Sequence, residues 1–219
     1  MSGPHCERAT PATTPFTGVD MVLRTGTSAD AAAAAALHAG QIREGFLASL
    51  GPRFLGRLYR RVPHVPGSFL LVVEAEGRIA GFLAGSVDVR ALYREFLIRD
   101  GAFAVFDCAW RFIRSPRRVF ETLRHGTSEE GGEPELLAVA VDPEARGLGG
   151  GRALVEGFLT EIARMGRSRA CVVVASGNHR AIALYRRTGF AVVERFELHR
   201  GSESLLMRHS ALSAGEPSQ

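Results

Sequence analysis

The chain has 219 residues, of which 46% are hydrophobic and 23% are charged, proportions that suit one folded domain and exclude a disordered chain. Its 27 basic and 23 acidic residues leave a net charge of +4, and every basic residue is arginine. The lack of lysine excludes a Walker-type phosphate loop, and without a dense basic block we expect no nucleic-acid partner.

The cysteine and hydropathy patterns predict a cytoplasmic protein. Cys6, Cys108 and Cys171 are far apart, with no CxxC pair and no metal-like spacing, which indicates free thiols in a reducing compartment. No apolar run reaches the ~18–20 residues that span a bilayer, so we expect no stable membrane insertion. The first residues are polar and lack the apolar core of a signal peptide.

One domain is expected over residues 21–210, between disordered tails at 1–20 and 211–219. The sequence of its first part predicts a short strand and a helix capped by Ser28 or Asp30. A second helix interrupted at Gly51-Pro52 and a hairpin of two apolar strands are expected to follow. The expected ranges are 22–24 for the strand, about 31–41 and 45–62 for the helices, and 68–75 and 78–89 for the hairpin.

Residues 91–133 predict a helical insert followed by a mobile loop. The apolar spacing over 91–125 is helical, with breaks expected at Gly101 and at Ser115-Pro116.

The last part alternates strands and helices, which places the chain in the mixed α/β class. The stretch "ELLAVAV" is apolar on both faces and is expected as a central strand. The elements expected after it are a helix over about 150–165, a strand over 170–176, a helix over 178–187, and strands over about 190–198 and 203–207.

A glycine-rich loop, Arg146 to Arg152, joins the central strand to the next helix. Main-chain N–H groups at a helix start lack internal partners and favour an anion, and glycine lets that backbone approach phosphate oxygens. The arginines at both ends would add charge-assisted hydrogen bonds. The dinucleotide pattern GxGxxG does not fit, because Arg152 and Leu154 stand where it needs small residues.

Two motifs together resemble the GCN5-related N-acetyltransferase (GNAT) superfamily. Arg146, Gly149 and Gly151 after "VDP" resemble its acetyl-coenzyme A signature, and "SGNHRAIALYRRTGF" resembles its second motif. The resemblance is tight over about 135–190, looser over the hairpin and first helices, and absent from 91–133. It implies a mostly antiparallel central sheet, flanked by helices, whose fourth and fifth strands splay apart.

The resemblance also implies a mechanism. Acetyl-coenzyme A (acetyl-CoA) is the implied acyl donor, and a primary amine of the acceptor attacks its thioester directly. The residues implied in binding the donor are Val139, Ala140, Val141, Arg146, Gly147, Leu148, Gly149, Gly150, Gly151, Arg152, Asn178 and Tyr185.

Two residues are the predicted catalysts. Tyr185 matches the position of the family's general acid, although a tyrosine there could also only pack its helix on the sheet. Glu135 is the predicted general base, ionised and near solvent, or else an ordinary exposed carboxylate at a strand end. Asn178 suits a helix cap as well as cofactor contact. His179 and His125 are weaker candidates for the base, and "VVVAS" lacks the fifth-strand glutamate that some members use.

The insert admits three interpretations. It could be two helices whose aromatic stripe covers the sheet, a lid whose arginines attract an anionic acceptor, or a helix pair on an anionic membrane. The aromatic and arginine residues concerned are Tyr93, Phe96, Phe103, Phe106, Trp110, Phe112, Phe120, Arg111, Arg114, Arg117 and Arg118.

The predicted function is therefore transfer of acetyl from acetyl-CoA to the amine of a small molecule. A bulky insert favours an enclosed pocket over a peptide groove, yet a protein N-acetyltransferase and a non-catalytic coenzyme A sensor stay open. Members of the family are often dimers, which makes a homodimer one further expectation.

Overall fold

The computed structural model describes residues 21–42, 47, 50–114, 132–199 and 202–210, with the side chains of 102–114, 198–199 and 202 excluded. The predicted tails, the break at Ser115-Pro116 and most of the predicted mobile loop lie outside these residues.

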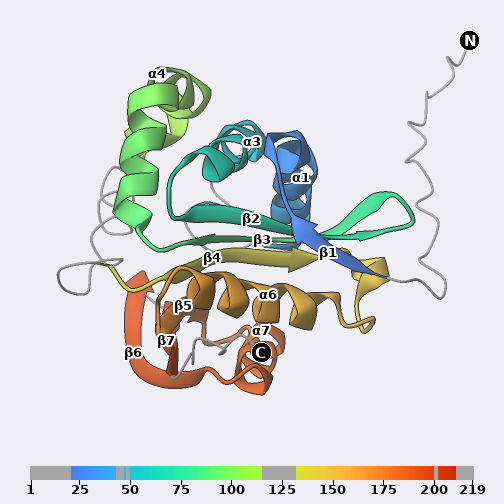
Figure 1. The fold of residues 1–219 in the computed structure, drawn as a ribbon. Helices are drawn as coiled ribbons and strands as arrows, with labels where there is room; N and C mark the ends of the chain where they lie inside the picture. The colour runs from blue at the N-terminus through green and yellow to red at the C-terminus, as the bar shows by residue number, and fades with distance from the viewer. Residues whose placement is uncertain (1–20, 43–46, 48–49, 115–131, 200–201, 211–219) are drawn as a thin grey trace, which may run out of the picture.

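Seven strands form one sheet in the order β1-β2-β3-β4-β5-β7-β6 (Figure 1). All neighbours pair antiparallel except β4 and β5, which are parallel. This confirms the predicted mixed, mostly antiparallel α/β fold. The strands are β1 (Val22–Thr25), β2 (Ser68–Ala75), β3 (Arg78–Ser86), β4 (Glu135–Val141), β5 (Arg169–Ala175), β6 (Ala191–His199) and β7 (Ser202–Ser210).

Helices cover both faces of the sheet (Figure 1). On one face lie α1 (Ala31–Gln41), α3 (Pro52–Arg61) and α4 (Val89–Arg114), and on the other lie α6 (Gly150–Arg164) and α7 (His179–Arg187). Single 3₁₀ turns occur at Ser28–Asp30, Val62–His64 and Pro143–Ala145.

A separate apolar core fills each side of the sheet. The stripe of α6 that includes Leu154, Phe158 and Ile162 is fully buried against alternate residues of β2, β4 and β5. On the opposite face, α1 and α3 bury alanines and Leu55 against Phe82 of β3 and its neighbours. Because both faces of β2 and β3 are covered, their sequences are almost continuously apolar.

One of the two expected caps is confirmed in position: Asp30 is the N-cap residue of α1. Its carboxylate accepts from the Thr27 N–H at 2.8 Å, while the Thr27 hydroxyl accepts from the Ala29 N–H at 3.3 Å and caps the 3₁₀ turn that Ser28 begins. One local prediction is wrong. The predicted break at Gly101 is absent, since α4 runs through it. A glycine inside a helix costs only about 1 kcal/mol, which the apolar spacing of the flanking turns offsets.

Within the described part of the chain, no helix is both long and apolar enough to cross a membrane.

Candidate active site

β4 and β5 separate almost as soon as they meet. Their pairing is confined to Glu135 and Cys171, supported by a hydrogen bond of 2.7 Å from the Cys171 N–H to the Pro134 carbonyl. Beyond this point β4 continues to Val141 paired with β3 alone. The Asp142 N–H donates to the Ala80 carbonyl at 2.8 Å, so by the alternation of an antiparallel ladder Ala140 also bonds β3, through Phe82. The main-chain groups of Val139 and Val141 face the open edge, and the expectation that Ala140 joins them is wrong.

The glycine loop presents a row of main-chain donors at the start of α6. Gly147 and Gly149 have φ angles of +84° and +90°, a left-handed backbone that favours glycine. The first internal bond of the helix runs from the Ala153 N–H to the Gly149 carbonyl at 3.0 Å. Among the described residues, none accepts from the main-chain N–H groups of 147–152. Leu148 and both glycines are exposed, which leaves this row open to an anion.

Gly151 lies where three parts of the site meet. A Cβ built on it would stand 3.5 Å from Leu184 of α7 and 3.6 Å from Val141 at the end of β4. Gly150 is buried beside Met21. The loop, the open edge of β4 and the helix that carries Tyr185 therefore converge.

The two loop arginines have other partners. Arg146 donates to the side-chain oxygen of Gln41 on α1, and Arg152 donates to Glu156, one turn along α6, at 2.7 Å. Both are exposed, so the main-chain donors, rather than these guanidinium groups, are the groups left without a partner.

α7 positions two of the predicted residues. Asn178 caps it by accepting from the Ala181 N–H at 3.2 Å, as predicted, and is exposed. Tyr185 is 4% exposed and its ring lies 5.8 Å from that of Phe190. Burial raises the pKa of Tyr185, so its hydroxyl stays protonated at neutral pH. His179 follows Asn178 and is exposed, as expected.

A β-bulge decides which way Glu135 faces. Ala84 pairs with Ala138 and Gly85 with Leu136, which leaves Leu137 as an extra residue in β4. Leu136 consequently packs in the core on the α6 side, while Leu137 packs against the α1 and α3 core. By strand alternation, Glu135 shares the α1 and α3 face with Leu137.

The environment of Glu135 differs from the predicted one. It is half-buried rather than near solvent, and burial raises its pKa from 4.5 to about 7. Tyr93 of α4 lies close to Glu135. Burial raises the pKa of Tyr93, and the negative charge of Glu135 raises it further. A carboxyl group that titrates near neutral pH suits general-base catalysis better than an ordinary glutamate.

Sequence reasoning missed a buried polar pair beside this group. His38 of α1 is 2% exposed, and its Nδ1 lies 2.5 Å from the hydroxyl of Tyr59 on α3. The His38 Nε2 is buried without a partner among the described residues, and burial lowers the His38 pKa to about 4. Tyr93 also contributes to the raised pKa of Tyr59. The sequence did contain a signal for the burial of His38, because helical spacing places it on the same face of α1 as Ala31, Ala34 and Ala35, which are buried.

Several residues or side chains that the sequence singles out lie outside the part of the chain that the structure describes. They are His125, Phe120, Arg117 and Arg118, together with the side chains of Phe103, Phe106, Trp110, Arg111, Phe112 and Arg114.

Comparison with known proteins identifies the family. The sequence model of the acetyltransferase (GNAT) family matches residues 40–190, which is more than half of the chain. The chain belongs to the GNAT acetyltransferase family.

Relatives and solved GNAT structures agree with this assignment. A mycothiol acetyltransferase of Geodermatophilus obscurus is 38% identical over 68 residues, which are 30% of this chain and 22% of that protein. The match thus spans about a fifth of the curated relative. Ard1 of Thermoplasma volcanium has the same fold, with a TM-score of 0.58 at 18% identity over 88% of this chain and 99% of its own. The putative acetyltransferase yncA of Salmonella typhimurium, solved with acetyl-CoA, has a TM-score of 0.57 at 18% identity over 90% and 98%.

Proposed function

We propose that this GNAT protein transfers an acetyl group from acetyl-CoA to a primary amine of a small molecule. One observation carries the proposal: a row of main-chain N–H groups at the start of α6, with no acceptor among the described residues, adjoins the open edge of β4. Such a row suits a diphosphate, and an open strand edge suits the amide groups of a pantetheine chain.

The residues present fit acetyl-CoA. Residues 147–152 would hold the diphosphate through main-chain N–H groups, and Val139 and Val141 would hold the pantetheine amides. The left-handed glycines and the space around Gly147 and Gly149, where an added Cβ would meet nothing within 4 Å, allow close approach. When bound, this donor supplies an activated thioester.

Glu135 and Tyr185 have protonation states that suit the two proton transfers. An alkylammonium group has a pKa around 10, so the acceptor amine must lose a proton before it attacks. Glu135, with a pKa of about 7, accepts that proton directly or through one water. Tyr185 keeps its proton until the thiolate leaves and then donates it.

The two residues occupy different sides of the sheet. Glu135 faces the α1 and α3 side, whereas Tyr185 packs in the core on the α6 side. The separation of β4 from β5 lies between them and connects the two sides. This arrangement lets donor and acceptor approach from different faces, and the acceptor enters from the face that α4 covers.

Mass spectrometry of products formed from acetyl-CoA and a pool of small amines tests the proposal. We expect acetylated amines among the products. The value of kcat/KM should rise with pH up to about 7 in wild type and should show no such rise in Glu135→Gln. Tyr185→Phe should lower kcat at least tenfold and leave coenzyme A affinity unchanged. Tight coenzyme A binding without any acetylated amine would contradict the proposal and favour a sensor, and products from peptides alone would favour a protein acceptor.

A further inference from the structure

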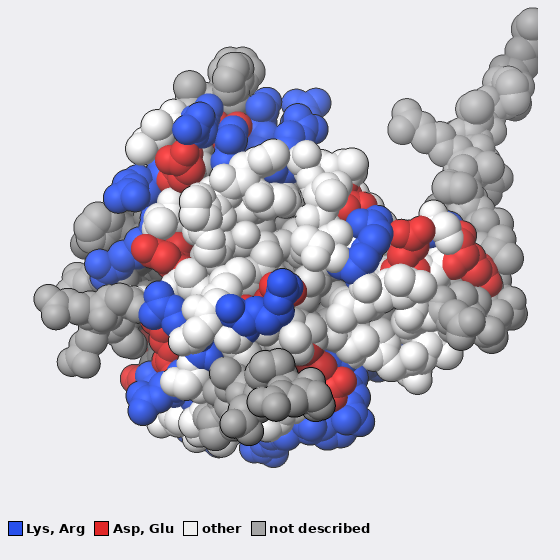
Figure 2. Space-filling model, viewed as in Figure 1, with Lys and Arg blue, Asp and Glu red and all other residues white. Residues whose placement is uncertain are grey.

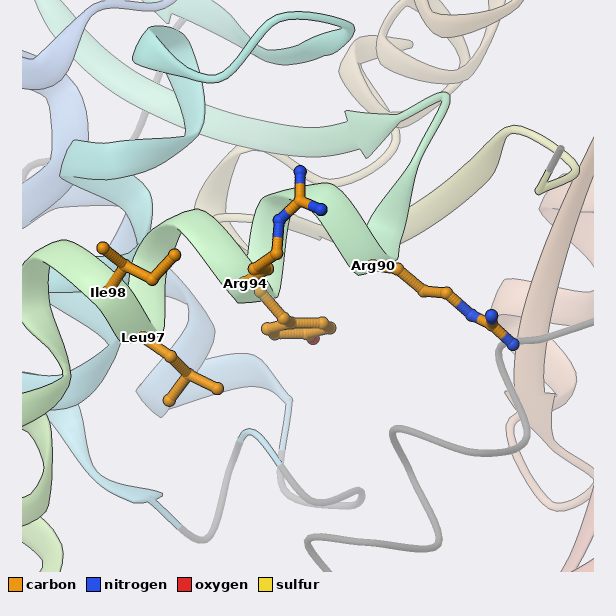
Figure 3. Close-up of a pocket in the computed structure, with 5 residues that line it drawn as sticks. Arg90, Arg94, Leu97 and Ile98 are labelled. Atoms are coloured by element: carbon orange, nitrogen blue, oxygen red, sulfur yellow. The ribbon is translucent and has the colours of Figure 1, made fainter.

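The first half of α4 carries a recess that the proposed chemistry leaves without a role. It is a shallow depression, widely open to solvent, with a volume of about 430 Å³. Its lining residues share one face of the helix and are Arg90, Tyr93, Arg94, Leu97 and Ile98. In Figure 3, Arg90 lies at one end, Leu97 and Ile98 lie at the other, and Arg94 comes between them.

The recess adjoins the predicted base. α4 begins three residues after Ser86, whose partner in the sheet is Glu135. Tyr93 lines the recess, and its pKa responds to the Glu135 charge. Tyr93 therefore links the recess to Glu135, with Arg90 on one side of it along the helix and Leu97 and Ile98 on the other.

The two arginines of the recess are not neutralised by any acidic residue that the structure describes. Glu95 is paired with Arg99 at 2.6 Å, and Asp100 is paired with an arginine of α3 at 2.7 Å. Neither Arg90 nor Arg94 forms an ion pair with any residue that the structure describes, and both are exposed. Figure 2 shows basic side chains gathered on the side of the molecule that α4 covers.

The far end of the recess is apolar and open. Leu97 is 50% exposed and Ile98 is 72% exposed, adjacent to each other on the helix. Two large aliphatic side chains lie beside two arginines that have no acidic partner among the described residues, and this combination suits a ligand with both an anion and an apolar group.

We propose that this recess binds the acetyl acceptor and selects an amine that resembles an apolar α-amino acid. The amine faces Glu135, a carboxylate or phosphate close to the amine is held by Arg90 and Arg94, and an apolar substituent lies on Leu97 and Ile98. This inference rests on the proposed function, because Glu135 acts as the base in it.

Three related amines test the selection: phenylalanine, phenethylamine, which lacks the carboxylate, and phenylalaninamide, in which it is neutral. We expect kcat/KM with acetyl-CoA to be about tenfold higher for phenylalanine than for the other two at low salt. The double variant Arg90→Gln/Arg94→Gln should abolish that preference while its rate with phenethylamine stays within about twofold of wild type. The control Arg99→Gln, on the same helix but outside the recess, should keep the preference.

The outcomes separate the two proposals. Equal losses for all three amines in the double variant, an unchanged preference, or a wild-type preference for phenylalaninamide would overturn the recess as an anion-selective site. If wild type acetylates none of the amines, the proposed function fails. The recess is then tested by calorimetric titration of phenylalanine: binding that the double variant loses supports it, and no binding overturns it.

Discussion

Replacing Glu135 with glutamine tests the environment of the predicted base through protein stability. Burial raises the Glu135 pKa from 4.5 to about 7. Because each tenfold change in an acid constant corresponds to about 1.4 kcal/mol, keeping this carboxylate ionised in the folded state costs about 2 to 3 kcal/mol after allowance for solvent screening.

The direction of the pH dependence follows because Glu135 binds its proton more tightly in the folded state than in the unfolded state. The stabilising contribution of protonated Glu135 is complete below pH 4.5 and is lost as the pH rises through about 7. Glutamine does not titrate, so the free energy of unfolding of Glu135→Gln should rise relative to wild type by about 2 to 3 kcal/mol from about pH 4 to about pH 9.

Urea unfolding followed by circular dichroism at a series of pH values measures this difference. Glu144→Gln is the matched control, because Glu144 is exposed and should show no comparable change. Wild-type and Glu135→Gln stabilities that stay parallel across the whole pH range would refute the reasoning, because they would show that Glu135 is ionised at no cost in the folded chain.

Two further predictions concern the buried polar pair. The folded-state pKa of His38 is lowered from 6.5 to about 4, so the free energy of unfolding of wild type should fall by about 2 to 3 kcal/mol relative to that of His38→Gln as the pH falls through this range. The comparison cancels the opposite contribution of Glu135, which both proteins share. In urea unfolding, exposed His179→Gln should show the same fall relative to His38→Gln, and stabilities of all three proteins that stay parallel would contradict the assignment. Tyr59→Phe leaves the His38 Nδ1 without its partner and should lower the free energy of unfolding by about 1 to 3 kcal/mol, and an unchanged denaturation midpoint would show that the 2.5 Å contact contributes nothing.

The features predictable from the sequence depend on short-range geometry. The loop at Gly147 and Gly149 and the cap at Asn178 use main-chain groups at helix starts, and the residue types that favour such positions stand next to one another in the sequence. The pairing of hydrophobic runs likewise predicts the hairpin of β2 and β3, because only a short turn separates them.

The acceptor side depends on contacts between distant segments. The face on which Glu135 lies follows from the bulge at Leu137, which appears only when β4 pairs with β3. The pairing of His38 with Tyr59 needs α1 and α3 side by side. The lack of an ion pair between Arg90 and the acidic residues that the structure describes depends on how all of these segments fold together. No periodicity in the sequence encodes these three facts.

The binding of coenzyme A by main-chain donors at the start of α6 is the central claim, and calorimetric titration of two glycine variants tests it most directly. Gly149 and Gly166 both have left-handed φ angles, +90° and +72°, and open space around the missing Cβ, so Gly149→Val and Gly166→Val should incur similar strain, about 1 to 2 kcal/mol. They flank opposite ends of α6. Wild type and Gly166→Val should bind coenzyme A alike, and Gly149→Val should bind at least tenfold more weakly. No heat from wild type, or equal affinity in both variants, would contradict the account.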